Sequence, residues 1–321
     1  MSHDTTTETS GSLLKSITRS PLILPLVGLV IVSIAMGFAS DNFFSLDNIL
    51  NILRQQSIIG ILAIGMTFVI LTGGIDLSVG AVMALAGTIG AGIMVNMGMP
   101  AEIGLLGMIA VGVLFGLFNG FLTAWGKMPA IIVTLATMLI ARGLGLVYSG
   151  GYPISGMPGW ISWFGVGRLG GIPVPIIIML VLYALAWVIL QRTSFGRHVY
   201  AIGGNETAAH LSGVNVKRVK LMVFAISGFT AAMAAIVLSG RLMSGQPGAG
   251  VAFELDAIAM VVLGGAAISG GRGLILGTLI GAVLLGIINN GLNLIGINPY
   301  LQDVIKGLII LLAIYISRER R

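Results

Sequence analysis

The sequence predicts an all-α, polytopic membrane protein with about ten transmembrane helices. Three observations indicate this class: 56% of the 321 residues are hydrophobic, only 9% are charged, and long apolar runs recur along the whole chain. Soluble domains carry roughly a quarter charged residues, so this chain could not cover a water-facing surface. Open strands are excluded because their unpaired backbone groups cannot face lipid. The 48 glycines suit close packing of helices in a bilayer.

A helix needs about 20 mostly apolar residues to cross a bilayer. Ten segments of the sequence meet or approach this length, and we expect them to cross in turn. In order they are 22–40, 57–73, 77–96, 102–124, 130–149, 173–191, 218–240, 256–271, 274–295 and 300–317. Segments 57–73 and 256–271 are short and broken by glycine, so their limits are the least defined.

The distribution of basic residues predicts the orientation, because Lys and Arg collect on the cytoplasmic side. With the N-terminus inside, the cytoplasmic gaps hold twelve of them and the outer gaps hold three. We therefore expect both termini in the cytoplasm, a transmembrane domain over 21–317 and a cytoplasmic tail over 318–321. The Ser/Thr-rich residues 1–20 are expected to be cytoplasmic and disordered. The alternative is a cleaved signal peptide over 1–40, but its apolar core is long and cleavage would remove the charge bias.

Two segments of the sequence resemble each other. Residues 73–91 and 264–282 both begin with Gly-Gly, and they end in Gly-Thr-Ile-Gly-Ala and Gly-Thr-Leu-Ile-Gly-Ala. A parallel internal duplication would produce this similarity. Chance in a glycine-rich apolar sequence is the alternative.

One long basic break interrupts the apolar sequence at residues 192–220 and holds seven of the twenty Lys, Arg and His residues. Gly203-Gly204 predicts a turn, Asn205 is a good N-cap for a helix starting at Glu206, and Gly213 suits a left-handed C-terminal position. Two turns are too short to be stable alone, so we expect this helix to dock against a partner. An ordinary loop that only serves the charge bias is the alternative, but it needs no caps.

The string "GNETAAHLSGV" in this break resembles the cytoplasmic coupling segment of ABC importer permeases, in particular permeases of ribose-type monosaccharide importers. Residues 42–57, 61–87, 253–273 and 277–296 are similar to other recurrent blocks of that family, in family order and spacing. The resemblance implies a type II ABC-importer-like permease, multi-pass in the bacterial inner (cytoplasmic) membrane. It also implies import of ribose or a related sugar.

The same resemblance implies the partners. They are an ABC ATPase subunit in the cytoplasm, a periplasmic or extracellular sugar-binding protein, and a second permease copy in a homodimer within membrane lipid. It makes residues 192–217 the coupling loop that docks on the ATPase. The docking role falls on Gly203, Asn205, Glu206, Ala208, Ala209 and Gly213, and the family's Glu-Ala-Ala signature stands here with Thr207 interposed. The small pair Ala208-Ala209 leaves room for a close-packed partner.

The string "TGGIDLSVG" contains an acid beside an apolar run, and an Asp at a helix centre in lipid costs about 2.5–3.5 kcal/mol. One interpretation is that Asp76 caps a helix starting at Leu77, at the cytoplasmic membrane edge. The other is a polar group in a hinge or gate, or a contact to the ATPase. The predicted gate or hinge residues are Gly73, Gly74, Asp76, Ser78 and Gly80.

Other polar residues within or beside spans are further candidates. Asn289, Asn290 and Asn293 are expected near the middle of a span, where they either bond neighbouring helices or contact sugar hydroxyls in the pathway. Glu254 and Asp256 are either helix-start acids or, with Arg241, a rim that binds the outer binding protein.

Several intramembrane side chains have structural interpretations only. Arg142 and Lys306 are expected to extend to an interface, and Lys306 can pair with Asp303. Gly112, Gly116 and Gly120 have a four-residue spacing that predicts a helix-packing face, inside the subunit or at a dimer seam.

Missing residue types exclude several functions. The absence of cysteine excludes disulfides and thiolate metal sites, and no HExxH or phosphate-binding G-x-x-x-x-G-K-[ST] motif occurs. We therefore expect no metal, no cofactor and no enzyme activity, with ATP hydrolysed by a partner chain. The net charge of +6 is explained by the cytoplasmic bias and predicts no nucleic-acid binding. The alternative function is an ion-coupled secondary transporter of a small polar solute, with Asp76 as the only plausible carboxylate.

Overall fold

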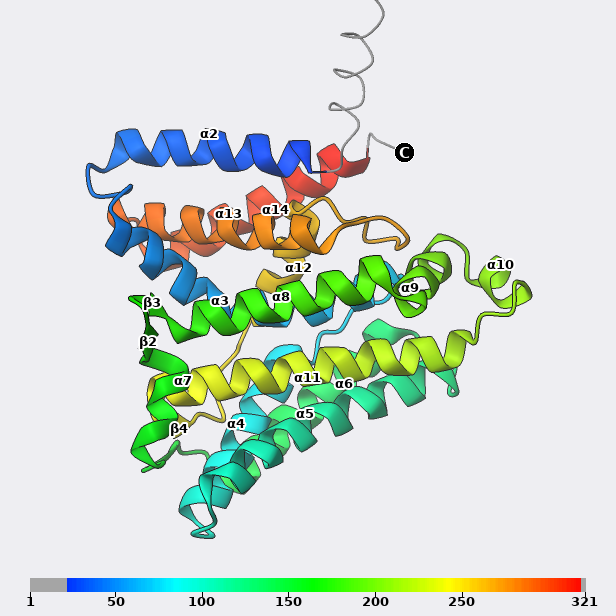
Figure 1. Cartoon of the computed structure of the whole chain (residues 1–321), viewed down its shortest axis with the longest axis horizontal. Coiled ribbons are helices and arrows are strands. Elements are labelled where there is room, and N and C mark those ends of the chain that lie inside the picture. The colour runs from blue at the N-terminus through cyan, green and yellow to red at the C-terminus, as the bar shows by residue number, and fades with distance from the viewer. Residues whose placement is uncertain (1–21, 319–321) are drawn as a thin grey trace, which may run out of the picture.

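A computed structural model describes residues 22–318, so the predictions for residues 1–20 and 319–321 lie outside the described part. Each of the ten predicted segments contains a helix (Figure 1). Within residues 22–318, six helices are long and apolar enough to cross a membrane. They are α3 (Leu46–Leu71), α5 (Ala101–Ala124), α6 (Ala130–Ser149), α8 (Val174–Arg192), α11 (Val216–Leu242) and α13 (Ile275–Leu294). The chain is thus a multi-pass membrane protein, while ten crossings and the side of each terminus stay predictions.

The remaining elements are shorter or more polar. The other helices at the predicted spans are α2 (Ile23–Ala39), α4 (Val79–Val95), α12 (Phe253–Leu263) and α14 (Pro299–Arg318). Short helices are η1 (Gly159–Ile161), α7 (Ser162–Val166), α9 (Ser194–Gly204) and α10 (Glu206–Leu211). Two antiparallel pairs join β1 (Ile154–Ser155) to β4 (Ser244–Gly245) and β2 (Arg168–Leu169) to β3 (Ile172–Pro173).

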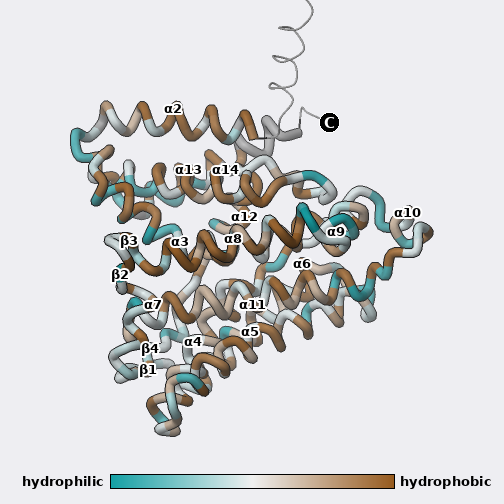
Figure 2. Tube along the Cα trace, viewed as in Figure 1, coloured by the Kyte–Doolittle hydropathy of each residue, from teal (hydrophilic) through white to brown (hydrophobic). Residues whose placement is uncertain are grey.

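The bundle has two distinct ends. In Figure 1, α9 and α10 lie together beyond one end of the long helices, and α7 lies with β2, β3 and β4 at the other. We call these the α10 end and the β4 end. Figure 2 shows apolar residues along the helix lengths and a polar stretch beside α9. This separation matches a bundle whose long helices lie in lipid and whose α10 end lies in water.

Helix α3 corrects the prediction of a short, glycine-broken span at 57–73. It runs unbroken over 26 residues, and its buried part extends from Gln56 to Leu71. Gly60 packs against Met179 of α8, and Gly65 packs against Ser227 and Thr230 of α11. These glycines allow close helix contacts, so they do not end the helix.

The predicted span at 256–271 is also corrected. Helix α12 has 11 residues, so it is about 16 Å long. The hydrocarbon core is about 30 Å thick, and α12 cannot cross it alone. An irregular segment, 243–252, leads into α12 from the end of α11, and a loop over 264–274 leads on to α13.

Helices α5 and α11 make the closest long contact, through the predicted glycine face. A side chain at Gly112 would meet the backbone of Gly228, and one at Gly116 would meet the backbone of Phe224. This places the face inside the subunit and not at a dimer seam.

Gly116→Leu is therefore expected to push α5 away from α11. Overpacking of this kind costs about 1–3 kcal/mol or more, so the melting temperature of the detergent-solubilised protein should fall. Gly143→Leu on α6 is the matched control, because no neighbouring segment lies within 4 Å of a Cβ atom built there. Equal melting temperatures for the two variants would contradict this packing.

Candidate functional site

The short helix α10 has the predicted caps at both ends. The side chain of Asn205 accepts a hydrogen bond from the backbone N–H of Ala208 at 2.9 Å. At the other end Gly213 has φ 86°, and its N–H donates to His210 O at 3.0 Å while Val214 N–H donates to Ala209 O at 3.1 Å. This pair of bonds is the Schellman arrangement that ends a helix at glycine.

The predicted turn at Gly203-Gly204 is wrong, because α9 continues as a helix through both residues. Gly203 instead lies against two other segments: a side chain there would meet Leu71 O, at the end of α3, and Gly271 N in the loop 264–274. Those two atoms are hydrogen-bonded to each other at 3.0 Å. Glycine at 203 thus allows backbone-to-backbone packing of three segments.

We call this contact of Leu71, Gly73, Gly203, Gly270 and Gly271 the glycine junction. Gly270 packs against Gly73, which has φ 79° and follows the end of α3. The two similar segments of the sequence, 73–91 and 264–282, therefore touch near their starts. The junction joins α9 to the loop before α4 and to the loop before α13.

Tyr200 adds a side-chain bond to the glycine junction. Its hydroxyl donates to Gly273 O at 2.9 Å and accepts a weaker bond from Gln191 at 3.4 Å. Burial raises the pKa of Tyr200 above its ordinary value, more than the bond from Gln191 lowers it. The hydroxyl therefore keeps its proton, and with it the bond to Gly273, at neutral pH.

The outer surface of α10 differs from the prediction at one residue. Ala209 is only 5% exposed, because it packs inside its own chain, whereas Ala208 is exposed. Ala209 thus leaves no room for a partner, and Ala208 does. Leu211 is 81% exposed, and Glu206 forms an ion pair with Lys220 at 2.7 Å that ties α10 to α11.

Asp76 does not cap a helix at Leu77, since α4 begins at Val79. One carboxylate oxygen of Asp76 accepts bonds from the backbone N–H of Ser78 at 3.0 Å and from its hydroxyl at 2.6 Å. The other accepts a bond from the Ser227 hydroxyl at 2.7 Å, and Asn119 donates to Ser78 Oγ at 2.9 Å. A local Asx turn competes with capping here. Asp76 thereby ties the start of α4 to α11, and Ser78 ties it to α5.

This polar cluster of Asp76, Ser78, Asn119 and Ser227 is buried near the α10 end. Asp76 is 2% exposed, and Asn119 lies about one and a half turns before the end of α5. Among the described residues, the space between these side chains is too small for a water molecule. A sugar could not pass beside Asp76 in this conformation. The cluster therefore acts as a tether, because its hydrogen bonds connect the start of α4 to α5 and α11.

The other predicted gate or hinge residues flank the tether. Gly73 and Gly74 lie in the break that follows the end of α3 at Leu71. Gly80, in the first turn of α4, allows close approach of Gly250 O and the Glu254 carboxylate. The break between α3 and α4 is therefore packed on two sides. The glycine junction contacts it at Gly73, and the segment 243–252 contacts it at Gly80.

The three asparagines lie in the last turns of α13, not in the middle of a span. Asn290 exchanges two hydrogen bonds with Asn48 of α3, at 2.9 and 3.0 Å. Asn293 accepts a bond from Gln302 of α14 at 2.8 Å. Within the described residues, Asn289 Oδ1 is buried with no hydrogen-bond partner. Asn290 and Asn293 thus form hydrogen bonds between helices. This is the first of the two roles that the sequence suggested, the other being contact with sugar hydroxyls.

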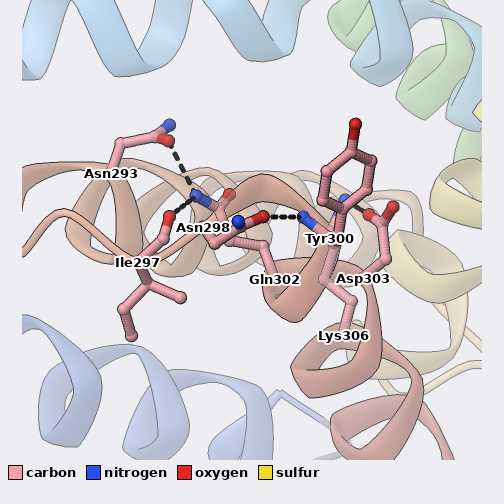
Figure 3. Close-up of polar contacts among 7 residues, drawn as sticks. All are labelled: Asn293, Ile297, Asn298, Tyr300, Gln302, Asp303 and Lys306. Atoms are coloured by element: carbon pink, nitrogen blue, oxygen red, sulfur yellow. Dashed lines mark hydrogen bonds and ion pairs between the residues drawn. The ribbon is translucent and has the colours of Figure 1, made fainter.

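The turn between α13 and α14 is built by the same polar side chains (Figure 3). Gln302 also donates to Ile297 O at 2.8 Å, and Asn298 Oδ1 accepts a bond from Tyr300 N at 2.9 Å. The predicted ion pair between Lys306 and Asp303 is present at 2.9 Å. These contacts give the polar side chains of the α13–α14 turn a structural role, because they hold the two helices together at the end of the bundle.

The three predicted rim residues have different neighbours. Arg241, in the last turn of α11, interacts electrostatically with Arg54, whereas Asp256 interacts with Lys306 and Asp303 of α14. Glu254 lies at Gly80 and interacts with Arg142 of α6. Glu254 therefore lies within electrostatic reach of Arg142, without a direct ion pair, and does not share this environment with Arg241.

Arg142 was expected to extend to an interface, and the structure gives its side chain partners in the segment 243–252. Its guanidinium donates to Pro247 O at 3.0 Å and also to Ala249 O. It thus holds the irregular segment 243–252 from the middle of α6. Sequence reasoning missed this contact because the partners are backbone carbonyls more than a hundred residues away.

Comparisons with known proteins match residues 48–314 to a family described as branched-chain amino acid transport system / permease component. The chain is 50% identical to the ribose import permease protein RbsC of Bacillus subtilis, over 92% of both chains. It is 48% identical to the protein of that name from Haemophilus influenzae, over 90% of both. The xylose transport system permease protein XylH of Haemophilus influenzae is 35% identical, over 96% of this chain and 98% of that one.

Proposed function

Because the chain belongs to the branched-chain amino acid transport system / permease component family, we propose that it is the permease subunit of an ATP-driven importer for a monosaccharide. The observation that carries the sugar class is the identity to ribose import permeases, which reaches 50% over nearly the whole chain. Identity to the xylose permeases is lower, at 33–35%, so ribose or a related sugar is the substrate that we infer.

ATP hydrolysis belongs to a partner, an ABC ATPase that docks on α10. The exposed Ala208 and Leu211 present an apolar surface to the ATPase, and the ion pair of Glu206 with Lys220 holds α10 to α11. The glycine junction then connects α9 to the start of α4 and to the loop before α13. Closure of the ATPase on ATP would move this junction and shift the helices between outward- and inward-open arrangements.

The orientation and assembly follow from the same proposal. The α10 end, with Arg192, Arg197, Lys217 and Arg218 exposed, faces the cytoplasm. The β4 end faces the sugar-binding protein, and the pathway runs between two copies of the chain in the bacterial inner membrane. The buried Asp76 cluster holds the start of α4 to α5 and α11, and we assign it to the hinge between α3 and α4.

The energy source tests this function against the ion-coupled alternative. Vesicles containing the chain, its ATPase and its binding protein are expected to take up ribose only with ATP, and to continue when an uncoupler collapses the proton gradient. Vesicles lacking the binding protein are the control and should take up little. Uptake that stops with the uncoupler but survives ATP depletion would overturn the proposal and favour Asp76 as an ion site.

A further inference from the structure

The irregular segment 243–252 lies inside the bundle and not above it. Gly245 packs against Thr88 in the middle of α4, and Gly250 packs against Gly80 at the start of the same helix. In a membrane, non-helical backbone occurs only where it is buried in protein or lines a water-filled cavity. Ser244, Gly245 and Gly250 are buried, but other residues of this segment are not.

Part of the segment 243–252 is exposed and strained. Gly248, Val251 and Ala252 are exposed, and Val251 reaches 70%. Met243 and Ala252 have φ of 52° and 66°, a left-handed backbone that is strained for a non-glycine residue. Such strain is found at ligand contacts and persists where the surroundings hold it. The exposed face of this backbone is therefore expected to meet water or protein and not lipid.

Two charged side chains hold the same segment. Arg142 binds the carbonyls of Pro247 and Ala249, and it interacts with the Glu254 carboxylate in the first turn of α12. Both side chains are only partly buried. Charged residues within membrane-spanning segments almost always face a bundle interior or a water-filled cavity and pair with each other or with carbonyls. Arg142 meets the second condition through its bonds to the two carbonyls.

We propose that residues 248–255, which include Glu254, form with Arg142 a hydrated wall of the sugar pathway. The wall would bind a neutral monosaccharide, and this assignment rests on the proposed import function. A guanidinium donates hydrogen bonds and a carboxylate accepts them, so adjacent sugar hydroxyls find both kinds of partner. The pair has no net charge, which suits an uncharged ligand. The pathway thus follows the α11–α12 connection and not the asparagines of α13.

Water access tests the wall directly, because the chain contains no cysteine and single cysteines can be introduced. Val251→Cys is compared with Leu114→Cys, a mid-helix residue of α5 that is 63% exposed. Both are treated, in the assembled importer in sealed vesicles, with a membrane-impermeant methanethiosulfonate applied from the β4 side. We expect Val251→Cys to react at least tenfold faster than Leu114→Cys, and ribose supplied with the binding protein to slow its reaction. Equal rates would overturn the proposal.

Glu254→Gln gives a second readout. Sugar uptake per assembled complex should fall at least tenfold, whereas Glu102→Gln, an exposed acid in the first turn of α5, should leave uptake unchanged. A loss of complex yield with unchanged uptake per complex would assign Glu254 a purely structural role and overturn the wall. Wild-type uptake in the same vesicles separates failure of the proposed import function from failure of the proposed wall. Uptake that needs no ATP would overturn the import function. Uptake that needs ATP, together with an unreactive Val251→Cys, would overturn the wall alone.

Discussion

Leu211→Glu is expected to abolish the stimulation of ATP hydrolysis by sugar-loaded binding protein. Leu211 is almost fully exposed on α10, so its replacement should leave folding and membrane insertion unchanged. An apolar anchor at the centre of an interface contributes about 2 kcal/mol or more, which corresponds to a loss of about 30-fold in ATPase binding. The measurement is ATP hydrolysis by the reconstituted complex, with co-purification of the ATPase as the binding readout.

A pair of neighbouring alanines provides the control for this docking surface. Ala208→Trp on the exposed side should block ATPase binding while the yield of folded permease stays normal. Ala209→Trp should lower that yield, because the side chain has no space inside the chain. Normal stimulation in both Leu211→Glu and Ala208→Trp would rule out α10 as the docking helix.

Asp76→Ala is expected to stop sugar uptake and to lower the melting temperature of the permease. The change leaves three donors in a buried site without their acceptor, namely the N–H and hydroxyl of Ser78 and the hydroxyl of Ser227. Each unsatisfied buried donor costs about 1–3 kcal/mol, although hydroxyl groups can reorient and recover part of it. The start of α4 would then no longer be held to α11. Thermal unfolding in detergent and uptake in vesicles measure the two effects.

Asp47→Ala is the matched control, because Asp47 is an exposed acid in the first turn of α3. It should retain uptake and lose at most a few tenths of a kcal/mol from its helix-start position. Uptake and melting temperature that stay at wild-type values in Asp76→Ala would contradict the tether.

Local sequence rules predicted α10 well because caps depend on neighbouring residues. Asn205 accepts from a backbone N–H three residues later, and Gly213 adopts the left-handed conformation that ends the helix. Gly203 was misread for the opposite reason. A glycine marks a turn or a close contact equally well, and the distinction lies in Leu71 and Gly271, which are remote in sequence.

The polar residues inside the bundle show the same limit. The spacing of Asn289, Asn290 and Asn293 gave no sign of Asn48 or Gln302, whose bonds decide what two of these amides do. Arg142 was judged by its position in a span, whereas its role depends on two carbonyls of the segment 243–252. Hydropathy placed a helix at each predicted span, although the limits of α3 and α12 differed, whereas the partners of buried polar groups needed the three-dimensional packing.

The backbone contact at Gly203 has a mechanical consequence. Side chains between two helices act as soft spacers, because a change of rotamer can absorb a small displacement before it reaches the next segment. At Gly203 no side chain intervenes, and α9 rests on the hydrogen bond between Gly271 N–H and Leu71 O. A shift of α9 must therefore either move the end of α3 and the loop 264–274 with it or break that bond. The connection is stiff, so nearly all of a displacement of α9 reaches both segments.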